Sequence, residues 1–478
     1  MTQAHVSSTQ AVASLWHAAG LPANALPHLS LTGADPVLPS SFPVGTAVQS
    51  AIGAAALMAA ELWHQRTGEA RQDVSVDMLH AAMECTGWFS VDGVVPDVWD
   101  KLSGLYACGA DVEPGFVRIH ANFAHHRDIA LRVLGCPEGA ETERAAVEQA
   151  LRHWRAEDFE TAVATAGGVA SALRSFDDWD AHPQGRALAA TPADLAPVRV
   201  ERIDGDDSGP RIWRALSDHA APLHGLRVLD LTRILAGPVA GRTLASHGAD
   251  VMLVNSPNLP NIEAIADTSR GKLSVHVDLQ TAEGRSQLQA LLSDAHVLLQ
   301  GYRPGALAAL GFGVEDSVRV RPGLVHVSLS AYGSEGPWAG RRGFDSLVQT
   351  ATGFNHAEAQ AAGAAQPRAM PIQVLDYSAG FLLAFGTQAA LWRQSREGGS
   401  WRVQVSLAGV AQWLRGLGRV ADGFAVTRPS PDAFVDTTDT GFGRLAAVRH
   451  AAVLSATPAH WSRPSMPPGS HPPIWPRD

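Results

Sequence analysis

The sequence predicts an α/β fold in which a doubly wound parallel sheet is accompanied by a smaller α+β domain. Two observations carry this prediction: a strand–helix–strand unit begins at Arg227, and further strands then alternate with helices up to residue 328. Such units make parallel sheets, whose ligands lie beyond the carboxyl ends of the strands. The expected strands are 227–231, 250–254, 273–279, 297–300 and 324–328, and the expected helices are 239–247 and 281–294.

The composition is that of an ordinary globular protein, since 46% of the 478 residues are hydrophobic and 18% are charged. The net charge is −10 and no block of Lys or Arg stands out, which argues against a nucleic acid or an anionic membrane as partner. The N-terminus lacks a secretory signal, and the apolar runs are shorter than the ~20 residues that span a membrane, so we expect a cytoplasmic protein.

The cysteines and histidines do not predict a metal centre. Cys85, Cys108 and Cys136 are too widely spaced for a disulfide framework or a zinc site, and we expect buried thiols. His120, His125 and His126 have no partner Cys or acidic pair at ligand spacing. We therefore predict no metal.

Shifts in the sequence pattern divide the chain into five segments. After Gly87, short strands alternate with helices such as 127–134 and 142–156, which is typical of a compact α+β domain. A polar stretch around Asp206 and Gly209 indicates a linker, and a proline-rich C-terminal tail indicates extended structure. We expect a partial N-terminal copy (1–86), a small α+β domain (87–203), a linker (204–222), a large α/β domain (223–420), and a loop with an extended tail (421–478).

An internal repeat relates the N-terminal segment to the large domain. When the chain is displaced by 329 positions, which places Trp63 on Trp392, the stretch AALMAAELWHQRTGEARQDVSVDM lies without a gap on AFGTQAALWRQSREGGSWRVQVSL. Helix, turn and strand follow in the same order in both stretches. This self-similarity predicts a duplication in which the first copy is degenerate.

One acid, Asp376, follows a short apolar run (372–375) and precedes a helix expected over 377–393. At such a strand-to-helix junction the carboxylate favours a helix N-cap, which accepts free N–H groups of the first turn. The alternative is a reactive carboxylate at the mouth of a site. In the first copy, the position corresponding to Asp376 is Ala47, so the repeated framework forms without this acid.

The loop after the first strand of the large domain does not predict a dinucleotide site. It reads TRILAGP rather than G-x-G-x-x-G, and the second strand ends at Asn255 without an acid to hold a ribose. The Gly-Pro turn is either a tight connection or a turn that directs backbone N–H groups at a phosphate or carbonyl.

Several ordered motifs resemble the class III CoA-transferases, a family that includes formyl-CoA and carnitine CoA-transferases. They are LRVLDLTRILAGPVAGRTLASHGADV, RGKLSVHVDL, YRPGALAALGFG, LVHVSLSAYGSEGPW, GFDSLVQTATG and VLDYSAG, with LSATPAHW in the tail. The resemblance implies a Rossmann-like large domain with a small domain, two interlocked subunits and hence a homodimer. The interval after residue 407 is too short for the family's small domain, so residues 87–200 are expected to supply it.

The resemblance also implies site residues. Asp376 matches the family's catalytic nucleophile. The loop residues Arg233, Ile234, Leu235 and Ala236 would line the chain of coenzyme A, a substrate rather than a cofactor. Lys272 and Arg303 would approach its phosphates or adenine, and Leu310 would lie at the adenine pocket. Taken without the family resemblance, Lys272 and Arg303 are better explained as solvated surface charges. Two positions depart from the family pattern. Family members often have an acid where Asn255 stands and Arg where Ala309 stands.

Three functions follow as alternatives. A CoA-transferase uses a carboxylate to attack a thioester, forms a mixed anhydride and then an aspartyl-CoA thioester, and passes CoA to a small carboxylic acid; the adjoining helix N-terminus is expected to keep Asp376 ionised. A related acyl-CoA racemase would need a second acid/base group where Phe344 stands. A non-catalytic CoA-binding protein is the third. The sequence identifies neither the donor nor the acceptor acid.

Overall fold

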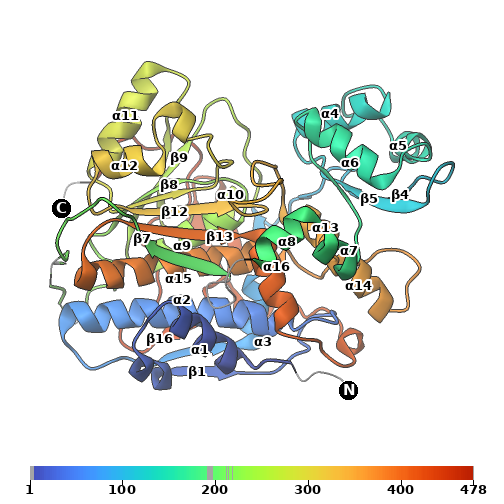
Figure 1. Cartoon of the computed structure of the whole chain (residues 1–478). Coiled ribbons are helices and arrows are strands. Elements are labelled where there is room, and N and C mark those ends of the chain that lie inside the picture. Colours follow the sequence, from blue (N-terminus) through green and yellow to red (C-terminus); the bar gives the residue numbers. More distant parts are fainter. Residues whose placement is uncertain (1–4, 191–196, 212, 214, 218, 477–478) are drawn as a thin grey trace.

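A seven-stranded sheet forms the centre of the computed structural model, which describes residues 5–190, 197–211, 213, 215–217 and 219–476 (Figure 1). All its strands are parallel except the antiparallel edge strand β7. The five predicted strands are confirmed as β8 to β12, because their apolar runs are buried on both faces. The strand order is β10 (Lys272–His276), β9 (Asp250–Asn255), β8 (Arg227–Leu231), β11 (Val297–Gln300), β12 (Val325–Ser330), β13 (Trp401–Ser406) and β7 (Val198–Arg202).

Helices cover the sheet on both sides. In Figure 1, α9 (Ala236–Ser246) and α15 (Val374–Glu397) lie on one side, and α11 (Ala282–Ser293) and α12 (Val314–Val320) on the other. α9 begins at Ala236, three residues earlier than expected, and packs tightly along α15. The connection between β12 and α15 carries α13 (Asp345–Ala351) and α14 (Phe354–Ala361), and α16 (Leu407–Gly416) follows β13.

The N-terminal segment forms a small layer beneath α15. It contains α1 (Ser8–Ala18), β1 (Leu29–Thr32), α2 (Val44–Thr67), β2 (Val74–Asp77) and α3 (Met78–Glu84). The helices α2 and α15 lie side by side, and each has 24 residues (Figure 1). By length and composition alone, both are apolar enough to cross a membrane, but these stretches are wholly buried in the protein, as in the core helices of soluble proteins, so this is weak evidence of a span.

The order of elements around α2 resembles that around α15. β1 and β2 are parallel and flank α2, as β12 and β13 are parallel and flank α15. The strand β16 (Ala452–Leu454) pairs antiparallel with β2, as β7 does with β13. These correspondences support the duplication, which stays a prediction.

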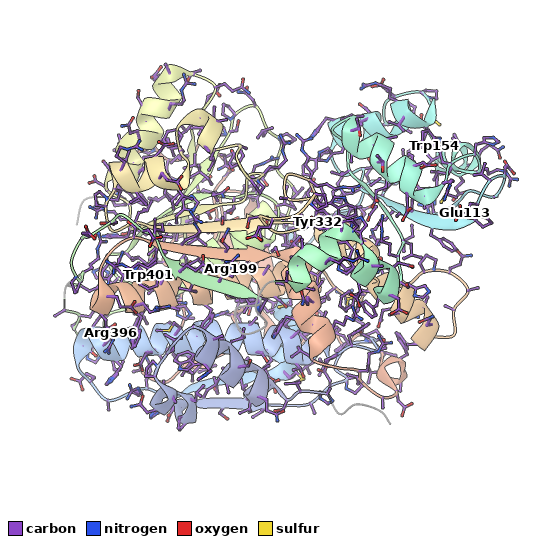
Figure 2. All side chains as sticks on the ribbon, viewed as in Figure 1. Glu113, Trp154, Arg199, Tyr332, Arg396 and Trp401 are labelled. Carbon is purple, nitrogen blue, oxygen red and sulfur yellow. The ribbon has the colours of Figure 1, made fainter. Side chains whose placement is uncertain are left out.

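A separate α+β unit follows the N-terminal layer. Its sheet consists of β4 (Gly104–Cys108), β5 (Gly115–Ile119) and β6 (Ala170–Ala172), and its helices are α4 (Ala124–Leu134), α5 (Arg144–Leu151) and α6 (Ala156–Thr165). The helix expected over 142–156 is present but shorter, because α5 ends at Leu151 and the chain turns before α6 begins. Figure 2 labels Trp154 in this unit and Trp401 in the main sheet, which belong to separate apolar cores.

Short segments join these parts. The helices α7 (Phe176–Ala181) and α8 (Pro183–Ala189) lead back to the sheet, where Trp179 and Trp338 pack around the buried Tyr332 labelled in Figure 2. β3 (Phe89–Val91) pairs with β15 (Gly443–Val448), and β15 with β14 (Val435–Thr440). In the expected linker, Asp206 is buried and accepts a hydrogen bond from the backbone N–H of Gly323, so the linker starts against the sheet.

Candidate active site

Asp376 lies in the first turn of α15 and is buried. The helix begins at Val374, so the expected strand over 372–375 is wrong: these apolar residues enter the core as loop and helix. The N-cap position is Gln373, which makes no side-chain capping hydrogen bond. The N-cap interpretation of Asp376 is therefore wrong as well, because Asp376 is the third residue of the helix and not its N-cap.

The first turn of α15 is instead capped by another acid, Asp345, at the start of α13. One oxygen of its carboxylate accepts the backbone N–H groups of Leu375 at 2.7 Å and Asp376 at 3.0 Å. The other oxygen accepts the side-chain amide of Gln349. Sequence analysis missed Asp345, although the GFD motif contains it, because its partners lie about thirty residues further along the chain.

Burial raises the pKa of both acids of this pair. Burial raises the pKa of Asp345 to about 6, although the N–H groups of Asp376 and Leu375 oppose the shift. Burial also raises the pKa of Asp376 well above its usual value, and the charge of Asp345 raises it further. Burial and the neighbouring carboxylate thus oppose the helix N-terminus, which was expected to keep Asp376 ionised; its ionisation stays a prediction.

The small α+β unit closes over this acid pair. The ring of His120 stacks on that of Phe344 with centroids 3.9 Å apart and an interplanar angle of 10°. Phe344 directly precedes Asp345, so residues far apart in the sequence meet at one site. Phe344 has no proton to exchange, which removes the second acid/base group that a racemase would use at this position.

The loop that precedes α9 lies next to the start of α15. A Cβ on Gly380 would stand 2.6 Å from the carbonyl oxygen of Ala236, so the two helices touch one turn after Asp376. Ile234 has φ 77°, a left-handed conformation that is uncommon for a β-branched residue and often marks a functional loop. Leu235, at the N-cap of α9, makes no side-chain capping bond. Ala236, at the end of the 233–236 loop, thus contacts α15 one turn after Asp376.

Two cations of the predicted site, Arg233 in this loop and Lys272 on β10, have different partners. The Arg233 side chain donates to the carbonyl oxygen of Pro260 and lies 5.8 Å from the ring centroid of Phe123, at the junction with the small unit. Lys272 is fully buried, and its ammonium donates to Asp230 at 2.9 Å and to the carbonyl oxygen of Pro238 at 2.8 Å. The alternative of a solvated surface lysine is wrong, and a contact between Lys272 and a phosphate stays a prediction.

The remaining predicted residues lie on the segment after β11. Arg303 is exposed, and its charge lowers the pKa of Arg342 in addition to the larger effect of partial burial. Leu310 is partly buried against the core beside α11. Asn255 ends β9 and its amide donates to Ser274 at 3.3 Å. Among the described residues, no group of three or more His, Cys, Asp or Glu is placed to hold a metal ion.

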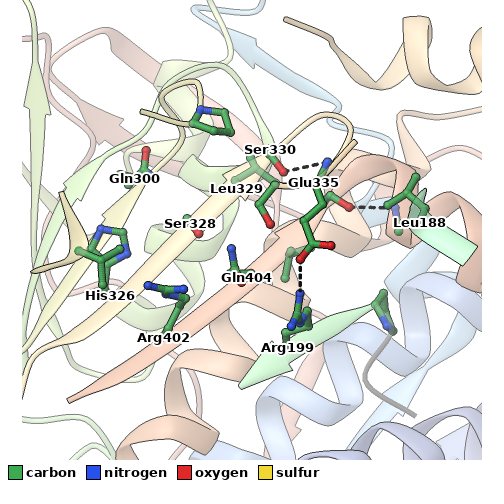
Figure 3. Close-up of a pocket in the computed structure, with 18 of the residues that line it drawn as sticks. Leu188, Arg199, Gln300, His326, Ser328, Leu329, Ser330, Glu335, Arg402 and Gln404 are labelled. Atoms are coloured by element: carbon green, nitrogen blue, oxygen red, sulfur yellow. Dashed lines mark hydrogen bonds and ion pairs between the residues drawn. The ribbon is translucent and has the colours of Figure 1, made fainter. Parts of the chain in front are cut away.

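A cavity of about 280 Å³ lies over β12, β13 and β7, apart from Asp376. Figure 3 shows His326, Ser328 and Gln404 along its floor. Arg199 and Glu335, 3.8 Å apart, form an ion pair at its rim. Because α15 covers the opposite side of the sheet, this cavity is not the site of the acid pair.

Comparisons with known proteins identify the family. The profile of CoA-transferase family III matches residues 223–421. The probable fatty acyl-CoA transferase Rv3272 of Mycobacterium tuberculosis is 32% identical over 274 residues, which cover 52% of this chain and 68% of that protein. The succinate–glutarate CoA-transferase of Agrobacterium fabrum is 33% identical over 209 residues, which cover 40% of this chain and 52% of that protein.

Solved structures of the same kind match parts of the chain. The crystal structure of Rv3272 in an orthorhombic form is 36% identical, with 41% of this chain and 58% of that chain covered and a TM-score of 0.38. A CaiB/BaiF family protein from Brucella suis is 27% identical, with 47% and 65% covered and a TM-score of 0.37. The chain spans half to two thirds of the length of these relatives. It belongs to CoA-transferase family III.

Proposed function

We propose that the protein transfers coenzyme A from an acyl-CoA to a carboxylic acid, with Asp376 as the nucleophile. The observation that supports this most is the contact between Ala236 and Gly380. Ala236 ends the loop at the carboxyl end of β8, where ligands of doubly wound sheets bind, and Gly380 lies one turn after Asp376. The relatives named above transfer CoA, and one is named for succinate and glutarate, which supports a small carboxylic acid as acceptor.

In the first half-reaction, a carboxylate oxygen of Asp376 attacks the thioester carbonyl of the acyl-CoA. The carbon–sulfur bond breaks, and the products are a mixed anhydride and CoA thiolate. The thiolate then attacks the Asp376 carbonyl of the anhydride, which leaves an aspartyl-CoA thioester and releases the donor acid. The acceptor acid reverses these steps and restores the carboxylate of Asp376.

The protein supplies position and charge for these steps, because a carboxylate is a weak nucleophile. Asp345 holds the first turn of α15 and thereby fixes the Asp376 backbone. We propose that the 233–236 loop lines the CoA chain, and that Arg303, beside Arg342, lies near its phosphates. Binding of a cationic or electron-poor group near the acid pair would favour the ionised nucleophile.

Substitution of the proposed nucleophile tests this function. We expect Asp376→Asn and Asp376→Ala to lose CoA transfer by at least about 10³-fold while still binding CoA, since removal of a nucleophile removes the covalent route. Undiminished transfer in either variant would contradict the mechanism. The homodimeric assembly and the cytoplasmic location expected from the sequence stay predictions.

A further inference from the structure

Arg118 is a buried cation without a counterion. Its side chain is only 7% exposed. Among the residues that the structure describes, it has neither an ion pair nor a side-chain hydrogen bond, and its Nε has no partner. Its guanidinium carbon lies 5.7 Å from the ring centroid of Trp99. Burial lowers the pKa of Arg118 to about 10, so the guanidinium remains charged at neutral pH.

The other buried arginines show that this arrangement is unusual in this protein. Arg174 pairs with Glu160 at 2.6 Å, Arg242 pairs with Glu84 at 3.1 Å, and Arg270 pairs with Asp267. A cation that leaves water without a partner loses several kcal/mol. Arginine is therefore almost never buried unless it is paired.

Arg118 lies near the acid pair. It belongs to β5, and His120 is the residue directly after that strand. His120 stacks on Phe344, the residue before Asp345, and α13 packs against β5. Asp345 is the charge that raises the pKa of Arg118 against the larger effect of burial. The oxygens of Asp345 are already occupied by Leu375, Asp376 and Gln349, so this acid does not pair directly with Arg118.

We propose that Arg118 binds the carboxylate of the acid that accepts CoA, an assignment that rests on the proposed function. An incoming carboxylate must approach Asp376 beside Asp345, and a fixed guanidinium offsets the repulsion between these negative groups. One carboxylate oxygen attacks the carbonyl carbon of the aspartyl-CoA thioester, the carbon–sulfur bond breaks, and CoA leaves as thiolate. The thiolate then attacks the acyl carbonyl of the anhydride and frees the Asp376 carboxylate.

The acid released by the donor leaves through the same contact, because both half-reactions place a free carboxylate at Asp376. The Nδ1 atom of the buried His120 also has no partner among the described residues, and it provides a neutral polar group beside the guanidinium. Trp99 covers Arg118 from the loop between β3 and β4, where Val94, Val95 and Val98 are exposed apolar side chains. Arg118 comes from the N-terminal half of the chain, so under this proposal that half takes a direct part in the reaction.

Steady-state kinetics with two substrates test this assignment. The variants are Arg118→Met, which removes the charge, and Arg118→Lys, which keeps it without the bidentate geometry. We expect Arg118→Met to raise KM for the acceptor acid about 10- to 100-fold and Arg118→Lys less, with KM for the acyl-CoA unchanged. Arg132→Met, which removes an exposed arginine of the same unit, is the matched control and should change neither KM.

A direct binding measurement keeps the test independent of catalysis. Acetate and glutarate are titrated calorimetrically into Asp376→Asn protein with and without Arg118→Met. Loss of binding for both acids supports the proposal, because acetate has only the reacting carboxylate. Loss for glutarate alone would place the remote carboxylate on Arg118 and overturn the proposal. Unchanged binding of both acids, or an equal rise of both KM values, would overturn it. If Arg118 binds acids but Asp376→Asn transfers CoA normally, only the proposed mechanism fails.

Discussion

The backbone N–H of Asp376 donates to the carboxylate of Asp345 at 3.0 Å, so one acid of the pair holds the other in place. The same device is found at the start of α2, where Asp35 accepts the backbone N–H groups of Gly45 at 3.0 Å and Thr46 at 2.8 Å. In α2 the second residue of this pair is Thr46, which cannot act as a carboxylate nucleophile. The shared cap is therefore structural, and the carboxylate of Asp376 is the part specific to the large domain.

The first prediction concerns pH. The reactive form of Asp376 is the carboxylate, and its pKa is raised, so kcat/KM for the acyl-CoA should increase with pH. Asp345→Asn removes the neighbouring charge and lowers the pKa of Asp376 towards its usual value. We therefore expect the rising limb of the pH profile, measured from about pH 4 to pH 9, to move to lower pH.

The exposed Asp294 provides the control for this profile, because Asp294→Asn removes a charge far from the pair in sequence and fold. It should leave the profile where it is. A profile of the Asp345→Asn protein that coincides with the wild type would show that the two carboxyl groups are not coupled in the working enzyme.

The second prediction concerns the contact between α9 and α15. A Cβ on Gly380 would stand 2.6 Å from the carbonyl oxygen of Ala236 and 2.7 Å from the Cβ of Val239. Gly380→Ala should push the two helices apart, lower the free energy of unfolding by about 1–3 kcal/mol and weaken CoA binding. Gly340→Ala, where no atom lies within 4 Å of the new Cβ, should change stability by no more than about 0.5 kcal/mol. Denaturant unfolding and CoA titration measure both effects, and equal values for the two variants would argue against the contact.

The third prediction concerns the docking of the N-terminal layer. Glu84 is buried, accepts from Arg242 at 3.1 Å and lies 3.1 Å from Nδ1 of His450. Burial alone would raise the pKa of Glu84, but His450 and Arg242 outweigh it and lower the pKa to about 2. Glu84→Gln removes the ion pair between residue 84 and Arg242, and should lower the free energy of unfolding by about 3–5 kcal/mol at neutral pH.

The pH dependence of that loss follows from the direction of the shift. A carboxyl group whose folded pKa is depressed stabilises the protein above its unfolded pKa of 4.5, and this contribution is lost as pH falls towards 2. The stability difference between wild type and Glu84→Gln should therefore shrink below pH 4.5. Glu141→Gln, at an exposed position, should show no such difference, and a pH-independent loss in Glu84→Gln would contradict the linkage.

The fourth prediction separates transfer from racemisation. Because Phe344 offers no proton, the wild-type protein should not exchange the α-proton of a 2-methylacyl-CoA in deuterated water. Nuclear magnetic resonance of the thioester after prolonged incubation measures this exchange. Exchange at a rate comparable with CoA transfer would favour the racemase alternative, and CoA binding without transfer or exchange would favour a non-catalytic protein.

The sequence predicted the parts of this molecule that local pattern determines. The strands β8 to β12 are short segments rich in Val and Leu, and such segments between turns indicate strands of a parallel sheet. The run 372–375 has the same local pattern and belongs to a helix start, because Asp345 satisfies the N–H groups of that turn from a distant segment. Tertiary hydrogen bonds thus determine that residues 372–375 lead into a helix, which the apolar pattern alone does not predict.

The candidate site likewise combines residues that local sequence predicts with residues that only the complete fold brings in. Asp376 and the 233–236 loop were found from local motifs, whereas Asp345 and Arg118 depend on how the small unit folds over α13. Lys272 was expected to be free for a phosphate, but the structure pairs it with Asp230, which is 42 residues away. Burial also opposes the expected ionisation of Asp376, since the desolvation of a carboxylate depends on the complete fold.

Identification of a covalent intermediate tests the central claim most directly. The protein is incubated with an acyl-CoA but without acceptor acid, treated with hydroxylamine, digested and analysed by mass spectrometry. The account predicts a hydroxamate at Asp376 that requires the acyl-CoA and is absent from the Asp376→Asn protein. An unmodified Asp376 under conditions in which CoA transfer proceeds would contradict it.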